Sequence, residues 1–366
     1  MSAILLAAGG TGGHLFPAQA LAEALVERGF SVVLATDHRI GRHSAAFPAD
    51  RIVEISSATL ASKSPVDLAK TSFQLAKGLR QARHLISEVN PAAVIGFGGY
   101  PSFPPVMAAI VSGVATAIHE QNAVLGRANK LLAKRVAAVA TSFPDVQHTE
   151  NLPPGRVVMT GNPVRARVRQ TAEAFGGYAS AGPDDRFRLV VFGGSQGARY
   201  FSDTVPEAIA ELSDRARARL EVIQQCRPED LERVQARYST LGVSAECAPF
   251  FDNLPEWIAS SHLVLARSGA STVAEIAVLG RPSILVPLPH AVENDQLQNA
   301  LRLEAVGGCL CQPQTDLTPH ALADLIARAM AEPEQLQAAA IAARALGRPD
   351  AHERLADLVG QIARQA

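Results

Sequence analysis

Short apolar runs alternate with longer amphipathic stretches along the whole chain of 366 residues. Apolar runs of strand length that are separated by helical stretches are typical of parallel sheets with crossover helices. The pattern therefore predicts an α/β protein with two Rossmann-like, doubly wound parallel sheets. The first sheet is predicted to contain residues 3–8, 31–36, 51–55, 93–97, 114–118, 136–141 and 156–159. The second is predicted to contain residues 188–193, 220–225, 244–248, 262–266, 283–287 and 308–311.

The boundary between the two predicted domains lies near residues 161–165, which read Gly-Asn-Pro-Val-Arg. The residue before a proline is disfavoured in helical geometry, which suits a crossover segment. We therefore expect an N-terminal domain over residues 1–162 and a C-terminal domain over residues 163–349. The last helix, about 350–366, is a candidate to pack back on the first domain.

Composition and charge describe a globular chain, because 48% of the residues are hydrophobic and 19% are charged. Residues 1–162 hold 14 Lys and Arg against 10 Asp and Glu, and the remainder holds 20 against 25. A mildly basic first domain suits an anionic surface. Residues 89–118 contain no charged side chain, but prolines and glycines interrupt them. We therefore expect a strand, a loop, a buried helix and a second strand there, not a membrane span.

The four cysteines, Cys226, Cys247, Cys309 and Cys311, lie in the second half of the chain. Cys309 and Cys311 form a C-x-C pair, but no second pair or histidine cluster completes a metal set. We expect buried, reduced thiols in a reducing compartment, and no metal site. The N-terminus lacks the basic region of a signal peptide, so nothing in it indicates export.

A glycine-rich turn follows the first predicted strand of each sheet, at residues 9–13 and 193–197. Glycine lets the backbone approach a ligand closely, and the N–H groups at the start of the following helix favour an anion. Two such turns at matching places suggest twin nucleotide-type domains that face one cleft. The dinucleotide pattern G-x-G-x-x-G fits the first turn poorly, since Leu15 stands at its third glycine position. Asp37 resembles a ribose-binding acid, which leaves a nicotinamide enzyme as an alternative.

Two polar groups are candidates for chemistry in the first domain. His14 stands where a helix begins, and the positive helix pole favours a neutral imidazole that can act as a base. Residues 119–122, His-Glu-Gln-Asn, follow a predicted strand and are expected to project into the cleft. Glu120 could orient a neighbour, and Asn122 could bind sugar hydroxyls. A histidine that only packs its own loop and an ordinary polar turn remain the alternatives.

The second domain has its sharpest segment at residues 267–275, Arg-Ser-Gly-Ala-Ser-Thr-Val-Ala-Glu. Small residues and hydroxyls before a helix at 271–279 suit a diphosphate, and Glu275 could accept both hydroxyls of a ribose. An acid in the first helical turn is also favoured by the helix dipole alone. Downstream, the amides of residues 294–299 suit a neutral polyhydroxyl ligand.

A predicted helix at about 65–89 has two different faces. Its basic stripe with an exposed aromatic side chain suits an anionic membrane surface, although a solvated basic face is the alternative. The apolar face contains Leu68, Leu75, Leu79, Ala82, Ile86 and Val89, and the opposite face contains Lys70, Phe73, Lys77, Arg80 and His84.

Six motifs, spaced in order along nearly the whole chain, resemble those of the MurG family of peptidoglycan glycosyltransferases, which have the two-domain GT-B fold. They are Gly-Gly-Thr-Gly-Gly-His (9–14), Gly-Phe-Gly-Gly-Tyr (96–100), His-Glu-Gln-Asn (119–122), Gly-Asn-Pro-Val-Arg (161–165), Gly-Gly-Ser-Gln-Gly-Ala (193–198) and the segment 267–275. Members of this family transfer N-acetylglucosamine from UDP-N-acetylglucosamine (UDP-GlcNAc) to the 4-hydroxyl of the MurNAc unit of lipid I, giving lipid II.

The resemblance implies a donor site for UDP-GlcNAc. In it Arg165 and Ser195 would lie near the diphosphate, Glu275 would bind the ribose, and the backbone of Phe251 would contact the uracil. Family members often have Ile or Val in place of Phe251, which a backbone contact tolerates. It also implies an acceptor site at Gly98, Gly99, Tyr100 and His14. The full implied donor set is Thr11, Gly12, Gly13, Asn122, Arg165, Ser195, Phe251, Ala270, Ser271, Thr272, Val273, Ala274, Glu275 and Gln296.

The implied mechanism is direct displacement with inversion, with His14 as the base and Glu120 as its partner or substitute. No D-x-D motif is present, so magnesium is tolerated but not required. The resemblance implies peripheral attachment to the cytoplasmic face of the inner membrane through Lys70, Phe73, Lys77 and Arg80, with Lys130, Lys134 and Arg135 nearby. Other cell-wall synthesis and division proteins are further candidate partners, and nucleic acid is not. A UDP-sugar epimerase, a glycolipid synthase and a non-catalytic nucleotide-sugar scaffold are the alternatives.

Overall fold

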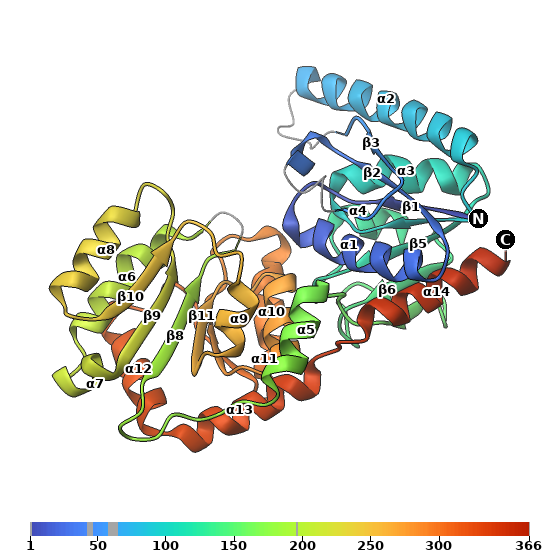
Figure 1. The fold of residues 1–366 in the computed structure, drawn as a ribbon. Coiled ribbons are helices and arrows are strands. Elements are labelled where there is room, and N and C mark those ends of the chain that lie inside the picture. The colour runs from blue at the N-terminus through green and yellow to red at the C-terminus, as the bar shows by residue number, and fades with distance from the viewer. Residues whose placement is uncertain (1, 42–46, 58–64, 195–196, 366) are drawn as a thin grey trace. The chain divides into compact units, whose positions relative to one another are not determined.

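The computed structural model describes residues 2–41, 47–57, 65–194 and 197–365. The chain forms two compact units, the first of Met1–Arg165 with Pro349–Ala366 and the second of Ala166–Arg348. Each unit has its own parallel sheet with helices on both faces (Figure 1). The first crossing between the units lies after Arg165, three residues beyond the expected boundary, and the last helix belongs to the first unit.

The sheet of the first unit has seven parallel strands in the order β3-β2-β1-β4-β5-β6-β7. All seven predicted strands are confirmed, with ends that shift by one or two residues. At the third motif the strand continues through Glu120 instead of ending at 118, and β6 begins two residues later than expected, at Ala138. The strands are β1 (Ala3–Ala7), β2 (Ser31–Thr36), β3 (Arg51–Glu54), β4 (Ala93–Gly96), β5 (Ala115–Glu120), β6 (Ala138–Thr141) and β7 (Val157–Met159).

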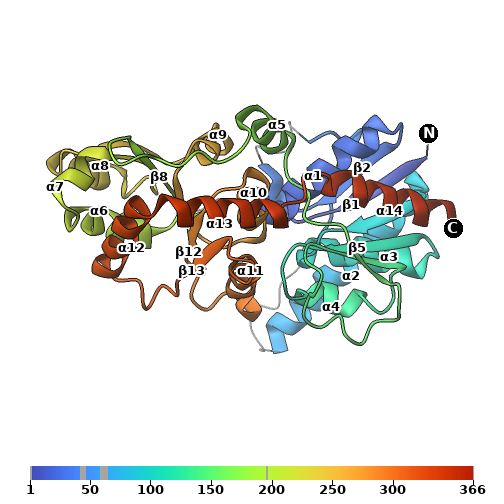
Figure 2. The ribbon, with the colours of Figure 1, turned by 90° about the horizontal axis from the view of Figure 1, so that it is seen from below.

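Helices cover both faces of this sheet (Figures 1 and 2). One face is packed by α1 (Gly12–Glu27) and α14 (Ala351–Gln365), and the other by α3 (Gly99–Val111), which also contacts α2 (Pro65–Val89) and α4 (Arg127–Leu132). Alternate apolar residues of β1 and the apolar stripe of α14 share one core, so α14 is an integral part of the first unit. Arg28 of α1 also forms an ion pair of 2.7 Å with Asp357 of α14.

The sheet of the second unit has six parallel strands in the order β10-β9-β8-β11-β12-β13, and all six predicted strands are confirmed. They are β8 (Phe187–Phe192), β9 (Leu220–Gln225), β10 (Ser244–Ala248), β11 (Leu263–Ala266), β12 (Ser283–Leu285) and β13 (Cys309–Cys311). The order reverses beside β8, which is the switch point where doubly wound sheets bind ligands.

The helices of the second unit pack apolar residues onto both faces of its sheet. Phe201 of α6, Tyr238 of α8 and Ile326 of α12 are buried in one core. On the other side, α10 contacts α5, α9, α11 and α13. The helices are α5 (Ala166–Phe175), α6 (Arg199–Ala210), α7 (Asp214–Arg219), α8 (Leu231–Thr240), α9 (Leu254–Ala259), α10 (Ala270–Leu279), α11 (Asp295–Glu304), α12 (Pro319–Ala331) and α13 (Pro333–Leu346).

The cysteines and the helix lengths bear on two further predictions. All four cysteines are free thiols, but only Cys226 and Cys247 are buried. Cys309 and Cys311 are half-buried, so the expectation of burial is wrong for them. They lie on β13, which is an edge strand and is therefore covered less than the central strands.

Among the described helices, none combines the length and apolarity needed to span a bilayer.

Candidate functional site

Four loops of the first unit carry predicted site residues, and all four follow the carboxyl ends of strands in one parallel sheet. These strands are β1, β4, β5 and β7, and such ends meet at the same edge of the sheet. The loops hold the predicted residues Thr11 to His14, Gly98 to Tyr100, Glu120 to Asn122, and Arg165. The first unit therefore has one candidate site, assembled from segments far apart in the sequence.

The first glycine turn is closed on one side by the loop after β2. A Cβ atom at Gly10 would lie 2.3 Å from the Ile40 nitrogen, so only glycine fits. The Asp37 carboxylate accepts the Gly10 N–H at 3.2 Å and the Arg39 guanidinium at 2.6 Å. Burial alone would raise the pKa of Asp37. The hydrogen bonds and the charge of Arg39 lower it by more than burial raises it, so the net pKa shift is downward. Asp37 is thus used within the turn, which removes the basis of the nicotinamide alternative.

His14 lies in the first turn of α1, against the turn that precedes α3. A Cβ at Gly99 would come within 3.3 Å of His14 Nε2, and one at Gly98 within 3.4 Å of its Cε1. Both glycines have positive φ, 79° and 70°, so they shape this turn without adding a side chain beside the imidazole. The structure therefore places the predicted base next to the predicted acceptor turn.

A chain of hydrogen bonds connects His14 to the sheet interior. His14 Nδ1 lies 3.1 Å from Gln121 Oε1, and Gln121 Nε2 lies 3.0 Å from His119 Nδ1. His119 Nε2 lies 2.9 Å from the Gly161 carbonyl oxygen. His119 and Gln121 are buried and their side-chain polar atoms are already hydrogen-bonded within the protein, so they position other groups, unlike the expectation that this segment projects into a cleft.

The His119 side chain makes the stability of the protein depend on pH. Burial lowers the pKa of His119 to about 4, against 6.5 in an unfolded chain. Between these values the unfolded state binds a proton that the folded state does not, so stability is full above pH 6.5 and falls toward pH 4. The full shift corresponds to roughly 3 kcal/mol. Urea unfolding at pH 7 and pH 4.5 should show a smaller pH effect in His119→Phe than in the wild type.

Glu120 is buried with both carboxylate oxygens directed at its own loop. Oε1 accepts the backbone and side-chain N–H of Asn122 at 3.0 and 3.2 Å. Oε2 accepts the Gly126 N–H and Asn129 Nδ2, both at 2.8 Å. Burial raises the pKa of Glu120, and these four donors oppose that rise. The geometry suits a residue that holds the loop, while a direct catalytic role for Glu120 stays a prediction.

Replacing Glu120 with Gln should destabilise the first unit. One of the two carboxylate oxygens would become an NH₂ group that faces the N–H donors of the loop. Those donors would lose their acceptor, and each unpaired buried donor costs about 1–3 kcal/mol. We expect the free energy of unfolding to fall by roughly 2–4 kcal/mol, as measured by urea titration. Glu88→Gln, which disrupts an exposed ion pair with Arg51, is the matched control and should have little effect. Equal stability of both variants would contradict this description of the loop.

Asn122 and Arg165 are the remaining predicted residues of the first unit. Asn122 is half-buried and close to Glu120, as described above. The Arg165 guanidinium lies over the Phe16 ring of α1, with Cζ 4.6 Å from the ring centroid. Because Phe16 is one turn from Gly12, this stacking holds a fixed cation beside the first glycine turn.

In the second unit, Gln225 at the end of β9 connects two predicted segments. Its Oε1 accepts the N–H of Gly193, and its Nε2 donates to the Pro249 carbonyl at 3.2 Å. The second glycine turn and the segment that leads to Phe251 are thereby held together at the sheet edge. Phe251 is buried, with 9% of its surface exposed. Ser195 lies outside the described residues.

Helix α10 begins at the same edge, directly after β11 and Gly269. The hydroxyls of Ser268 and Ser271 are buried and have no hydrogen-bond partner among the described residues. Glu275 is buried on the second turn of the helix, with 6% exposed. Unsatisfied hydroxyls beside the free N–H groups of a helix start are the groups that a diphosphate could bind. Ala270, Thr272, Val273 and Ala274 share this helix start.

Arg267 and Gln296 have different roles in this edge. Arg267 is buried and donates to the Val286 and Pro287 carbonyls, both at 3.1 Å, so it braces the loop after β12. Gln296 Oε1 accepts the Leu288 N–H at 3.0 Å, and its NH₂ group has no hydrogen-bond partner among the described residues. Asn299, which belongs with Gln296 to the segment 294–299, donates to the Ser268 carbonyl and so holds the residues that precede α10.

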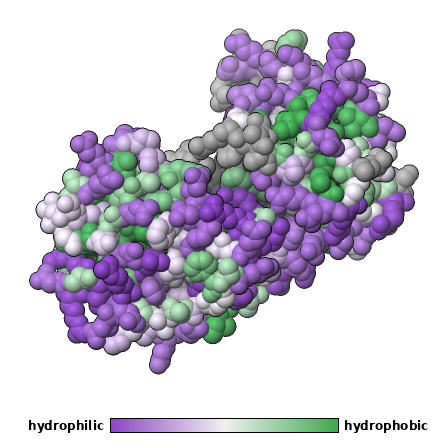
Figure 3. Space-filling view, viewed as in Figure 1, coloured by the Kyte–Doolittle hydropathy of each residue, from purple (hydrophilic) through white to green (hydrophobic). Residues whose placement is uncertain are grey.

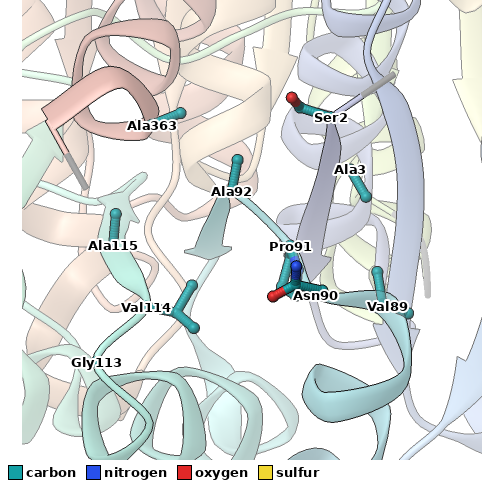
Figure 4. A pocket seen from close by; sticks show the side chains of 10 residues that line it. All are labelled: Ser2, Ala3, Val89, Asn90, Pro91, Ala92, Gly113, Val114, Ala115 and Ala363. Carbon is teal, nitrogen blue, oxygen red and sulfur yellow. The ribbon is translucent and has the colours of Figure 1, made fainter.

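A separate pocket lies at the opposite edge of the first sheet, at the amino ends of β1, β4 and β5 (Figure 4). Mostly small residues, together with polar Asn90, line it, and it holds none of the predicted site residues. Its lining includes Ser2, Ala3, Asn90, Val114 and Ala363. We assign no chemistry to it.

Sequence reasoning found the loops but missed the residues that hold them. Gln225 and Asn129 are supports that the sequence did not single out, and His119, which was expected to project into the cleft, is a support as well. For Gln225 and His119 the available signal was a polar residue in an otherwise apolar strand run, and Asn129, on α4, gave no such signal. No cluster of three metal-binding side chains occurs in the described part of the chain.

Comparison with known proteins identifies the family to which the chain belongs. The N-terminal domain model of glycosyltransferase family 28 matches residues 4–141, and its C-terminal domain model matches residues 188–355. The two sheets and the site residues at their carboxyl edges define a glycosyltransferase of the GT-B fold, and the enzyme class is that of hexosyltransferases. The chain belongs to glycosyltransferase family 28.

Individual relatives agree with this family. The chain is 52% identical over 365 residues to the UDP-N-acetylglucosamine–N-acetylmuramyl-(pentapeptide) pyrophosphoryl-undecaprenol N-acetylglucosamine transferase of Allorhizobium ampelinum, covering 98% of this chain and 95% of that protein. MurG of Acinetobacter baumannii is similar in structure, with a TM-score of 0.79, 27% identity, and coverage of 99% and 100%. A UDP-GlcNAc 2-epimerase from Neisseria meningitidis, at a TM-score of 0.68 and 14% identity, covers both chains fully and shares the fold alone.

Proposed function

We propose that the protein transfers N-acetylglucosamine from UDP-GlcNAc to the 4-hydroxyl of the MurNAc unit of lipid I, giving lipid II. The observation that carries the proposal is the 52% identity, over 98% of the chain, to a transferase named for this donor and acceptor. The position of His14 next to the Gly98–Gly99 turn supports it, because a base is needed where the acceptor hydroxyl reacts.

The proposed reaction is a single displacement with inversion at the anomeric carbon. His14 Nε2 takes the proton of the acceptor hydroxyl, whose oxygen forms the new bond to the anomeric carbon. The bond from that carbon to the diphosphate breaks, and UDP leaves with the electron pair. The N–H groups at the start of α10 and the Ser271 hydroxyl meet the charge that grows on the diphosphate.

Donor recognition is proposed mainly at the second sheet edge. Glu275 binds the ribose, Ser271 and its neighbours at 270–274 bind the diphosphate, and Gln296 donates to the sugar. The segment at Phe251 contacts the uracil through its backbone. On the sequence motifs alone, Thr11, Gly12, Gly13, Asn122, Arg165 and Ser195 also stay proposed donor contacts. The acceptor pyrophosphate is assigned to the starts of α1 and α3, where two helix poles favour an anion.

A direct test is radiolabelled sugar transfer from UDP-GlcNAc to a short-chain lipid I analogue. We expect a labelled disaccharide lipid, formed at an unchanged rate with EDTA, because we propose that magnesium is not required. Omitting the acceptor is the control. Conversion of UDP-GlcNAc to an epimer without acceptor, or binding without turnover, would contradict the proposed reaction.

We further propose that α2 attaches the protein to the cytoplasmic face of an anionic membrane. Phe73 is 69% exposed, and Lys70, Lys77 and Arg80 are exposed at helical spacing beside it. In Figure 3 the surface over α2, at the top, is mainly hydrophilic with isolated hydrophobic residues. The neighbouring α3 and α4 add exposed Val111 and Leu131, followed in sequence by exposed Lys134 and Arg135, and half-buried Lys130 lies in α4.

Replacing Lys70, Phe73 and Lys77 with Ser should weaken binding to anionic vesicles. Each lysine near an anionic surface contributes about 1 kcal/mol and the aromatic ring adds apolar contact, so we expect roughly a 30-fold or larger loss. Vesicle co-sedimentation measures the binding, and UDP binding in the same variant should be unchanged. Unchanged vesicle binding would refute the attachment through α2. Replacing exposed Arg215 and half-buried Arg237 of the second unit with Ser is the control for charge loss.

A further inference from the structure

The hydrogen-bonded chain from His14 through Gln121 to His119 is here called the amide relay. At each of its hydrogen bonds, the surroundings fix which atom donates and which accepts. The argument rests on the proposed role of His14 as the base. His119 and Gln121 share one face of the extended segment, because alternate residues of a strand point the same way. Glu120 points to the other face, where its four N–H donors hold it. The carboxylate is thereby kept out of the relay.

The deep end of the amide relay is fixed by a carbonyl group. His119 Nε2 lies 2.9 Å from the Gly161 carbonyl oxygen, and a carbonyl oxygen can only accept. His119 Nε2 therefore carries a proton. Burial keeps the pKa of His119 near 4, so the ring is neutral and its Nδ1 is an acceptor.

The orientation of the Gln121 amide follows from two acceptors at one of its ends. His119 Nδ1 lies 3.0 Å and the His119 carbonyl oxygen lies 3.1 Å from the same nitrogen, Gln121 Nε2. An NH₂ group has two hydrogens and can satisfy both acceptors, whereas an amide oxygen in that place would face two acceptors. The Gln121 oxygen must consequently face His14 Nδ1, which lies 3.1 Å away.

We propose that Gln121, oriented by His119, is a positioning residue that fixes His14 in the tautomer with its proton on Nδ1. An oxygen acceptor opposite Nδ1 requires a proton there, so the lone pair of the neutral ring lies on Nε2. Nε2 and its neighbour Cδ2 form the edge of the ring that faces Gly99, since a Cβ built on Gly99 would lie 3.3 Å from each, and this is where we place the acceptor. When Nε2 takes the acceptor proton, the Nδ1–H bond to Gln121 is kept and the ring does not rotate.

The first test measures the tautomer itself. Long-range ¹H–¹⁵N spectra of the full chain, labelled in its ten histidines, distinguish protonated from unprotonated ring nitrogens. The His14 signal is assigned by its loss in His14→Asn. At pH 8 we expect a protonated Nδ1 and an unprotonated Nε2 in the wild type. Protonation at Nε2 would overturn the inference, and this measurement needs no substitution in the relay.

The second test uses Gln121→Met, which keeps the side-chain length and removes the oxygen. We expect kcat to fall roughly 10- to 100-fold, the range seen when the orienting partner of a ligating histidine is removed. KM for UDP-GlcNAc should not change, since Gln121 is buried away from ligands. The matched control is Gln19→Met in α1, which should keep the wild-type kcat. A Gln121→Met variant that behaves like Gln19→Met in both kcat and tautomer would overturn the inference.

His119 supplies a graded version of the same test. The new amide of His119→Asn can place an oxygen where Nδ1 stands and still accept from Gln121, whereas the ring of His119→Phe cannot accept a hydrogen bond there. We expect His119→Asn to retain more kcat than His119→Phe, and equal losses would count against the relay. The proposed base role fails separately: if His14→Ala keeps turnover while the wild-type spectrum shows the Nδ1 proton, the relay stands and the catalytic assignment falls.

Discussion

His14→Ala should lower kcat for sugar transfer by about 10² to 10⁴, the usual contribution of a positioned general base. The imidazole lies against Gly98 and Gly99, and its Nδ1 is bonded to Gln121, so Nε2 is the ring atom left to receive a proton. UDP binding should be unchanged, because we assign donor recognition mainly to the second sheet edge. Radiolabelled transfer gives kcat, and calorimetric titration gives the UDP affinity.

His38→Ala is the matched control for this substitution. His38 is exposed, lies in the loop after β2 and has no assigned role, so its loss should leave kcat near the wild-type value. A His14→Ala enzyme with more than a tenth of the wild-type kcat would show that another group accepts the proton. Glu120 would then be the next residue to replace, at the cost in stability described above.

Glu275→Ala should raise KM and Kd for UDP-GlcNAc by about 10²-fold. A carboxylate that accepts both ribose hydroxyls makes two charge-assisted hydrogen bonds, and losing them should weaken binding by about 3 kcal/mol or more. Glu275 is buried at the second turn of α10, so its carboxylate is held close to the helix start and is poorly solvated. The effect on kcat should be much smaller, since ribose contacts are present before and during the reaction.

A ligand variant makes the Glu275 prediction specific. The wild type should bind 2′,3′-dideoxy-UDP about as weakly as Glu275→Ala binds UDP, and the variant should not distinguish the two ligands. Glu232→Ala, which changes an exposed acid of α8, should bind both as the wild type does. Full discrimination between the ligands by Glu275→Ala would remove Glu275 from the ribose site.

The fold could be predicted from the sequence because its strands are short apolar runs with turn residues at both ends. β12 (Ser283–Leu285) was predicted at its correct start, directly after Pro282, although the prediction ran two residues too far, through Pro287. The error at β5 has a physical cause. His119 and Glu120 are polar and buried, and their hydrogen bonds replace the water that polar residues normally need. A pattern of apolar and polar letters cannot express such internal satisfaction.

The candidate site was predictable to the level of loops. Residues after parallel strands must meet at one edge, so His14, Gly99 and Gln121 could be placed near each other. Which atom faces which depends on contacts across long stretches of chain, such as His119 with Gly161. The same limit applies to Asp37, whose spacing suggests a ribose acid but whose carboxylate is taken by Arg39 and Gly10. Only three-dimensional neighbours reveal that competition.

The position of α14 has a consequence for how the protein is made. Leu355 and Val359 of this helix are fully buried in the core that contains Leu21 of α1. Both residues are synthesised only after residues 166–348. The apolar side of α1 therefore stays exposed while the entire second unit is being synthesised. Because domains usually fold as they emerge, the second unit should be able to complete its folding first. During translation, the nascent first unit should be the part of the chain that is bound by chaperones.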